Sequence, residues 1–119
     1  MSKYFTENEL KCKCGKCTTF VFDSGLLKDL DGYREFINKP VSLLSAYRCT
    51  NHNNEVGGVS GSAHEDGLAV DIKVSNSTDR FNCIQFFVIK GYTRLGIGKD
   101  FVHVDKDLTK PSNVIWTYY

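Results

Sequence analysis

Apolar residues recur at helical spacing in two long stretches of the chain. In the first stretch, one helix face collects Leu26, Leu27, Leu30, Tyr33, Phe36 and Ile37. Asp23 or Ser24 can cap this helix at its start. In the second stretch Thr78 can serve as the cap, and Gly91 ends the helix. A shorter segment, residues 50–56, ends at a pair of glycines. The pattern therefore predicts helices over residues 23–38, 50–56 and 78–90.

Five short runs are typical of β-strands because they are continuously apolar or alternate with polar residues. They cover residues 41–45, 68–74, 93–97, 101–104 and 114–118. Residues 1–22 predict an irregular lead-in with a turn at Gly15, and residues 57–68 predict a glycine-rich loop. Helices and strands do not alternate regularly, and the later strands follow one another through short turns. The predicted fold class is therefore α+β, with a mainly antiparallel sheet and helices packed against it.

The length and charge of the chain narrow the class of protein. Its 119 residues, 41% of them hydrophobic, predict a single domain over residues 1–119, and we expect a monomer. The formal net charge is only +1 and the basic residues are spread out, which argues against a nucleic-acid partner. No apolar segment is long enough for membrane insertion, and the first residues lack the apolar region of a signal peptide. We therefore expect synthesis in a cytoplasm.

The cysteines leave two interpretations open. Cys12, Cys14 and Cys17 are clustered, while Cys49 and Cys83 lie far from them in the sequence. Three clustered cysteines can belong to a structural zinc site, but no fourth ligand is obvious nearby. In a reducing compartment, a turn that carries free thiols is the simpler interpretation. A catalytic cysteine is disfavoured because no histidine is spaced locally to activate one.

Two histidines and a carboxylate lie beside strand-like runs and can meet in space. His64 belongs to the glycine-rich loop, Asp71 to the strand after it, and His103 to a later strand. Strand alternation places His103 and Asp105 on the same face, opposite the two valines beside His103. Two imidazoles and one carboxylate form a three-ligand zinc site with an open position for water, as a hydrolase needs. Taken singly, each histidine also fits an exposed position or a hydrogen-bonded buried one.

The residues around His64 resemble a known family. Ser62-x-His64-x-x-Gly67-x-Ala69-x-Asp71 matches the SxHxxGxAxD signature of the M15 family of zinc D-alanyl-D-alanine peptidases. That family includes carboxypeptidases, dipeptidases and phage endolysins, and it shares its fold with the Hedgehog signalling domain. Further similar segments are residues 45–49, 51–58, 101–105 and 113–118, and the lead-in resembles short phage and prophage members. The resemblance extends over nearly the whole chain and implies the same fold.

The resemblance implies roles for several residues. His64, Asp71 and His103 match the zinc ligands, with one Zn²⁺ per chain. Arg48 matches the arginine that contacts substrate or stabilises charge near the scissile bond, as a guanidinium can. Further substrate-site residues are expected at Tyr47 and Ser62, which would shape the site, and at Trp116, which either walls the cleft or belongs to the core.

The general base has two candidates. Several family members carry Glu three residues before the last histidine ligand, and this chain has Asp100 there. We expect Asp100 to take the proton of the attacking water. Asp105 is the second candidate, although its carboxylate can instead orient a metal-binding side chain by hydrogen bonding to it. Glu65 and Asp66 are interpreted as solvated loop charges or contacts at the rim of the site, and His52 as structural or exposed.

The resemblance also implies a substrate, the stem peptide of bacterial peptidoglycan. Cleavage as a D-Ala-D-Ala carboxypeptidase or as an L-Ala-D-Glu endopeptidase fits equally well. With no signal peptide or wall-binding domain evident, we expect a phage or prophage endolysin that acts at the cell wall after release, or a virion-associated enzyme. Two alternatives remain open: a non-catalytic zinc-binding virion or interaction module on the same fold, and a small thiol-metal module centred on the clustered cysteines.

Overall fold

The fold is described from a computed structural model that covers residues 2–17, 20–58 and 61–119. The elements follow the order α1 (Glu7–Leu10), α2 (Ser24–Ile37), β1 (Leu43–Ser45), α3 (Thr50–Glu55), the 3₁₀ helix η1 (Ala63–Asp66), β2 (Ala69–Lys73), α4 (Ser77–Ile89), β3 (Arg94–Ile97), β4 (Phe101–Asp105) and β5 (Val114–Thr117). Parts of the predicted lead-in and loop, at residues 1, 18, 19, 59 and 60, lie outside the described residues. The predicted α+β class is confirmed.

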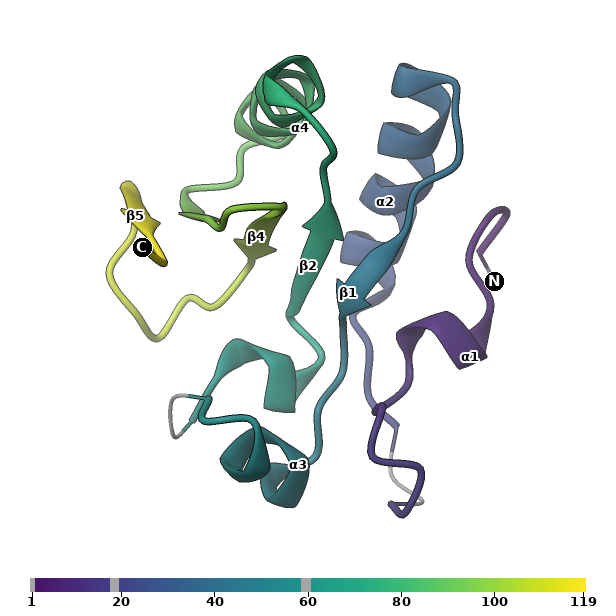
Figure 1. Ribbon diagram of the computed structural model, residues 1–119, viewed down its shortest axis with the longest axis vertical. Helices are drawn as coiled ribbons and strands as arrows, with labels where there is room; N and C mark the ends of the chain where they lie inside the picture. The colour runs from purple at the N-terminus through teal and green to yellow at the C-terminus, as the bar shows by residue number, and fades with distance from the viewer. Residues whose placement is uncertain (1, 18–19, 59–60) are drawn as a thin grey trace.

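The five strands form one sheet in the order β1-β2-β4-β3-β5 (Figure 1). The β1–β2, β2–β4 and β3–β4 pairs are antiparallel. The β3–β5 pair is parallel, so the sheet is mainly but not wholly antiparallel. In Figure 1, α2 and α4 lie toward one end of the view and α3 toward the other, beside η1. Helices α3 and η1 thus lie beyond the end of β1 and the start of β2, at the end of the molecule that carries the histidine loop.

Strand alternation gives the sheet two chemically different faces. On one face Val70 and Ile72 of β2 and Val102 and Val104 of β4 are fully buried. They belong to the apolar core with buried side chains of α2 and α4, namely Leu26, Leu30, Tyr33, Cys83 and Phe87. Burial of this apolar surface is the main driving force for the fold. The residues between the valines therefore face the opposite side of the sheet.

Helix α2 begins and ends as its residues predict. The side chain of Asp23 accepts a hydrogen bond from the Leu26 N–H, which satisfies one of the free donors of the first turn. At the other end Asn38 adopts the left-handed conformation, with φ of 54°, which asparagine tolerates better than most residues. Both boundaries agree with the prediction over residues 23–38.

Several local predictions differ from the structure. The lead-in contains the short helix α1, because Thr6 and Glu9 form a capping box and Leu10 is buried. The loop over residues 57–68 contains η1. Helix α4 is capped by Asn76, not Thr78, since the Asn76 side chain accepts a hydrogen bond from Asp79 N. No helix among the described residues has the length and apolar character needed to cross a bilayer.

Candidate metal centre

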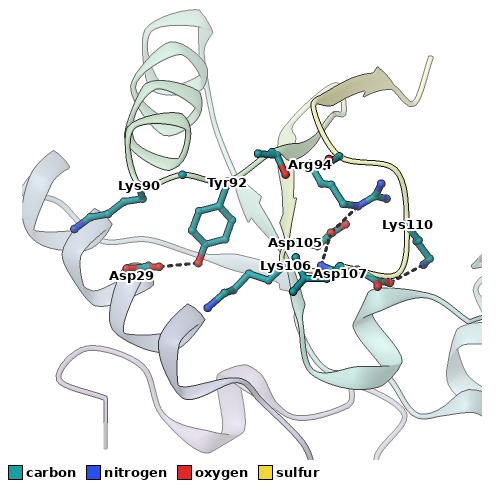
Figure 2. Close-up of a pocket in the computed structure, with 12 residues that line it drawn as sticks. Asp29, Lys90, Tyr92, Arg94, Asp105, Lys106, Asp107 and Lys110 are labelled. Carbon is teal, nitrogen blue, oxygen red and sulfur yellow. Dashed lines mark hydrogen bonds and ion pairs between the residues drawn. The ribbon is translucent and has the colours of Figure 1, made fainter.

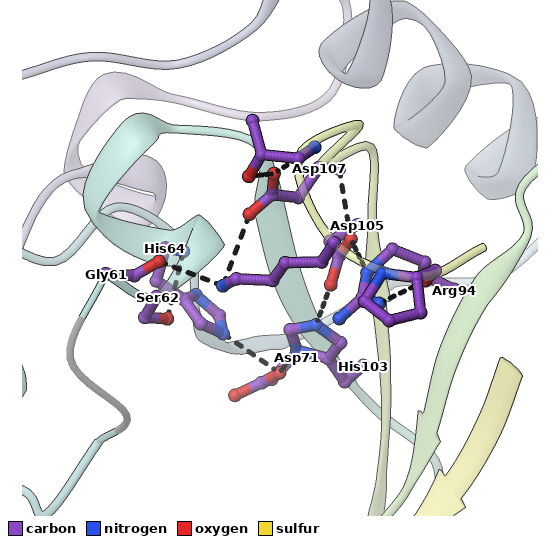
Figure 3. Close-up of polar contacts among 11 residues, drawn as sticks. Gly61, Ser62, His64, Asp71, Arg94, His103, Asp105 and Asp107 are labelled. Atoms are coloured by element: carbon purple, nitrogen blue, oxygen red, sulfur yellow. Dashed lines mark hydrogen bonds and ion pairs between the residues drawn. The ribbon is translucent and has the colours of Figure 1, made fainter.

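Three donor side chains that are distant in the sequence come together on the polar face of the sheet. His64 lies on η1, Asp71 on β2 and His103 on β4 (Figure 3). Asp71 and His103 stand opposite each other in the antiparallel β2–β4 pair, which brings their side chains into reach. One donor atom of each residue lies within 4.8 Å of the other two. The three are therefore placed to share one metal ion.

One oxygen of Asp71 lies between the two imidazoles. Its Oδ1 is 2.9 Å from Nδ1 of His103 and 3.3 Å from Nε2 of His64. The centroids of the two imidazole rings are 5.1 Å apart. The converging atoms are thus two imidazole nitrogens and one carboxylate oxygen, a donor set that suits zinc better than the oxygen-seeking Mg²⁺ or Ca²⁺.

The tautomer of His64 leaves a lone pair on Nε2, which faces the Asp71 oxygen where the three donor atoms converge. Its Nδ1 lies 2.6 Å from the carbonyl oxygen of Ala46. A carbonyl can only accept a hydrogen bond, so Nδ1 donates and Nε2 carries the lone pair. The Nε2 atom is buried and has no hydrogen-bond partner among the described residues. A buried nitrogen without a donor is costly, and a metal ion shared with Asp71 satisfies it, so these residues fit a metal.

His103 is held from behind by a carboxylate. Its Nε2 donates to Oδ2 of Asp105 over 2.7 Å. The other oxygen of Asp105 accepts from Nε of Arg94 at 2.8 Å and from the backbone N–H of Asp107 at 3.1 Å (Figure 2). Both oxygens of Asp105 are therefore engaged, and the residue orients His103 so that Nδ1 faces Asp71.

The charges of the site favour a cation at the point where the ligands meet. Burial opposes ionisation of Asp71, but the hydrogen bond from His103 and the adjacent His64 ring outweigh it and hold the pKa of this carboxyl well below its usual range. Burial likewise works against a charged His103, but hydrogen bonds to Asp105 and Asp71 prevail and raise the pKa of the imidazole. Two carboxylates around one imidazole thus attract positive charge.

The ligands line a cavity of about 640 Å³ that also contains possible substrate contacts. Its wall includes Arg48, Ser62, Phe101, Lys110, Trp116 and Tyr118. The Nε of Arg48 is buried and has no hydrogen-bond partner among the described residues. A buried guanidinium nitrogen without an acceptor is costly, so an anionic or carbonyl group bound in this cavity would satisfy it.

The glycine of the histidine loop is required by its surroundings. Gly67 ends η1 with φ of +69°, in the left-handed region. A Cβ atom added there would lie 2.2 Å from the backbone oxygen of Val21. The Asp23 N–H also donates to the carbonyl of Gly67. The chain before α2 thus passes directly against the turn that holds His64, and only glycine permits that approach.

A second glycine makes room for the aromatic wall. Gly96 of β3 stands beside His103 on one neighbouring strand and beside Trp116 on the other. A Cβ atom at Gly96 would lie 2.6 Å from Nε1 of Trp116. The indole therefore extends across the sheet, with its centroid 5.4 Å from that of His103, and Arg94 lies over the ring at 5.0 Å. Trp116 is half-buried here and forms part of the cavity wall.

Comparison with known families decides the classification. The family model described as Peptidase M15 matches residues 3–105, which include all three metal-binding candidates. The chain belongs to the peptidase M15 family. This membership makes it a metallopeptidase of a family that is generally zinc-dependent. No curated protein matches the chain. Strand β5, with Trp116, lies beyond the matched segment of this M15 peptidase.

The M15 domain places its two candidate bases differently. Asp100 is exposed in the turn between β3 and β4, and it is not among the residues that line the cavity, although its neighbour Phe101 is. No described residue forms a hydrogen bond or ion pair with its carboxylate. Asp105 is buried beneath His103 with both oxygens engaged. Of the two, only Asp100 has a carboxylate available to accept a proton.

Of the other residues predicted for the site of this M15 domain, some line the cavity and others do not. Ser62 caps η1 by accepting from the His64 N–H at 3.2 Å, and it lines the cavity. Tyr47, the chain neighbour of Arg48, is buried but is not among the lining residues, and its ring packs edge-on against Phe20. His52 lies on α3, outside the cavity.

The interpretation of Glu65 as a solvated charge is wrong. Its carboxylate accepts from Thr50 Oγ1 at 2.9 Å and from Asn53 Nδ2 at 2.8 Å. These contacts tie η1 to α3. Glu65 is therefore a structural link that helps to hold the histidine loop, whereas Asp66 is exposed as expected.

Sequence reasoning missed two groups that orient the ligands in this M15 peptidase. Arg94 supports Asp105, and the Ala46 carbonyl sets the tautomer of His64. Alternation along β3 offered a signal for Arg94, since Leu95 and Ile97 are core residues and their neighbours face the site. A backbone carbonyl such as that of Ala46 has no sequence signal.

Proposed function

We propose that this metallopeptidase uses zinc to hydrolyse an amide bond in the stem peptide of bacterial peptidoglycan. The observation that supports this best is the buried Arg48 guanidinium nitrogen without an acceptor, in the same cavity as His64, Asp71 and His103. A D-Ala terminus and the D-Glu residue each place a free carboxylate near a scissile amide. Arg48 can bind such a carboxylate or the oxyanion that develops during attack.

His64, Asp71 and His103 would hold the zinc ion. When bound, zinc supplies Lewis acidity that makes a water molecule more nucleophilic and a carbonyl more electrophilic. Asp100 takes the proton of the attacking water as the new C–O bond forms. It then delivers that proton to the leaving nitrogen as the C–N bond breaks. Its exposed position in a turn requires its side chain to swing toward the cavity past Phe101.

The rest of the cavity fits a short peptide with small side chains. Trp116 and Phe101 provide apolar walls against which alanine methyl groups can pack. Lys110 lines the same cavity. Its Nζ donates to the Gly61 carbonyl at 2.9 Å and pairs with Asp107 at 3.2 Å, and Figure 2 shows the pair with Asp107. The proposal includes a role in phage or prophage lysis at the cell wall, on the resemblance of the lead-in to short phage and prophage members.

The test is digestion of purified peptidoglycan by the zinc-loaded protein, followed by mass spectrometry of the muropeptides. Loss of a terminal alanine identifies a carboxypeptidase, while separation of L-Ala from D-Glu identifies the endopeptidase. A His64→Ala variant should lose the activity, and His52→Ala is the matched control because this histidine lies outside the cavity. An unchanged muropeptide profile with folded, zinc-loaded protein would overturn the proposal.

One observation favours a second candidate, a non-catalytic zinc-binding module. The carboxylates that line the cavity belong to Asp71 and Asp105, and both are engaged by histidines. Without movement of Asp100, the described residues that line the cavity offer no carboxylate that is free of a histidine. Zinc-loaded protein that binds peptidoglycan fragments in its cavity but releases no new amino groups would support this candidate over the peptidase.

A further inference from the structure

Four cysteine sulfurs gather at a second place, away from the histidine ligands. Cys12, Cys14 and Cys17 lie in the segment after α1, and Cys49 is the N-cap residue of α3. All four Sγ atoms lie within 4.8 Å of one another. Cys12 and Cys49 are 3.7 Å apart and Cys14 and Cys49 are 3.9 Å apart, measured between sulfurs. Cys49 is thus the fourth thiol that the spacing of the first three does not reveal.

These separations match shared coordination and not a disulfide. Bonded disulfide sulfurs are about 2.05 Å apart. Four sulfurs held at about 2.3 Å from an ion in tetrahedral geometry lie roughly 3.8 Å from one another. The two sulfur–sulfur distances from Cys49 lie on either side of that value.

Backbone N–H groups point at the sulfurs of Cys12, Cys14 and Cys49, as they do at thiolates that bind a metal. The N–H groups of Lys16 and Cys17 point at Sγ of Cys14, at 3.3 and 3.4 Å. The Cys49 N–H donates to Cys12 Sγ and the His52 N–H to Cys49 Sγ, both at 3.4 Å. Hydrogen bonds from backbone amides stabilise a negatively charged sulfur more than a neutral thiol.

We propose that Cys12, Cys14, Cys17 and Cys49 bind a second zinc ion. Four protein ligands leave no open position, so the site is structural and not catalytic. On binding, the four thiols release four protons, and the tetrathiolate complex carries a net charge of −2. Lys11, Lys13 and Lys16 are exposed in the same segment and offset that charge. The chain then holds two ions, and this second site does not depend on the proposed function.

The ion would cross-link the N-terminal segment to the segment that carries Arg48. Cys49 directly follows Arg48, whose N–H donates to the carbonyl of His64 at 3.1 Å. The neighbouring Tyr47 N–H donates to the Leu10 carbonyl at 3.0 Å. Zinc at the cysteines would therefore fix this short stretch of backbone at Cys49, while the hydrogen bond to Leu10 holds it at Tyr47. Its loss is expected to lower thermal stability and to loosen Arg48.

The first test counts zinc in protein purified under reducing conditions. We expect about two ions per chain in the wild type, with one of them released by an organomercurial that attacks thiolates. Cys14→Ser/Cys17→Ser should retain about one ion, bound by the histidines. Cys83→Ser is the matched control, since Cys83 lies in the apolar core, and it should retain both. A wild type with one ion that resists the mercurial would overturn the proposal.

A second measurement keeps the test decisive if the double variant fails to fold. His64→Ala/His103→Ala leaves the cysteines intact, and cobalt added to this variant should give the intense thiolate-to-metal absorption of a tetrahedral sulfur site. A spectrum without those bands would contradict the second site. So would a disulfide that includes Cys49 in protein that has been purified under reducing conditions. Because this variant lacks the histidine ligands, its outcome is independent of peptidoglycan cleavage.

Discussion

His103 donates from Nε2 to Asp105 over 2.7 Å, and this contact turns its Nδ1 toward Asp71. Asp105 is itself held by Arg94 at 2.8 Å. The arrangement runs from an arginine through a carboxylate to an imidazole and ends at the metal-binding point. A ligand ring locked in this way has little orientational freedom to lose when a metal binds.

Asp105→Asn should therefore weaken zinc binding by roughly 10- to 100-fold. The amide lacks the charge that favours the His103 tautomer and that pairs with Arg94. Competition with a chromophoric chelator measures the affinity. Asp107→Asn is the matched control, because Asp107 is as buried but contacts Thr109 and Lys110 instead of a histidine. Equal affinities in the two variants would contradict the orienting role of Asp105.

Asp100→Asn should lower kcat by roughly 10²- to 10⁴-fold, as expected for loss of a general base. Zinc content should not change, since Asp100 touches none of the metal ligands. Release of amino groups from peptidoglycan measures kcat, and Asp66→Asn, an exposed carboxylate near His64, provides the control. Full activity of Asp100→Asn would remove this residue from the mechanism.

Gly67→Ala should destabilise the fold and impair zinc binding. Gly57 has nearly the same backbone angle, with φ of +73° against +69°, but a Cβ atom there meets nothing within 4 Å. Gly57→Ala therefore measures the cost of the left-handed backbone alone, about 1 kcal/mol. Gly67→Ala adds the collision with Val21 and should cost more. Urea denaturation compares the two variants, and equal free energies of unfolding would show that the chain before α2 yields easily.

Asp23→Ala should lower the free energy of unfolding by about 1 kcal/mol at neutral pH, because α2 loses its N-cap. The hydrogen bond from the Leu26 N–H is the main cause that holds the pKa of Asp23 below its usual 3.8, with burial opposing and Lys106 assisting. A folded pKa below the unfolded one means that this stabilisation is present above the unfolded pKa. It is lost as the pH falls through the folded pKa.

The difference in stability between wild type and Asp23→Ala should consequently shrink on acidification. Denaturation at neutral pH and at a pH below the folded pKa measures it. Asp23→Asn is the control, since its side-chain oxygen still caps the helix but does not titrate. A difference that stays constant with pH would exclude the charged cap as the source of the stabilisation.

Local patterns in the sequence were sufficient for much of the fold and for selecting three candidate metal ligands that the structure brings together. Alternation over residues 101–105 predicts that His103 and Asp105 share a face, and the structure places them so, because side-chain direction in a strand depends only on the backbone. The bounds of α2 follow from Asp23 and from the helical period, both of which act within a few residues.

Tertiary structure alone decided which distant groups complete these patterns. Cys49 joins the three clustered cysteines, and the Ala46 carbonyl sets the tautomer of His64, only because packing brings their segments together. The same holds for Arg94 behind Asp105 and for the exposure of Asp100. Spacing along a strand or helix is set by backbone geometry, which a short sequence encodes. Contacts between segments depend on the simultaneous burial of the whole core, which no single motif contains.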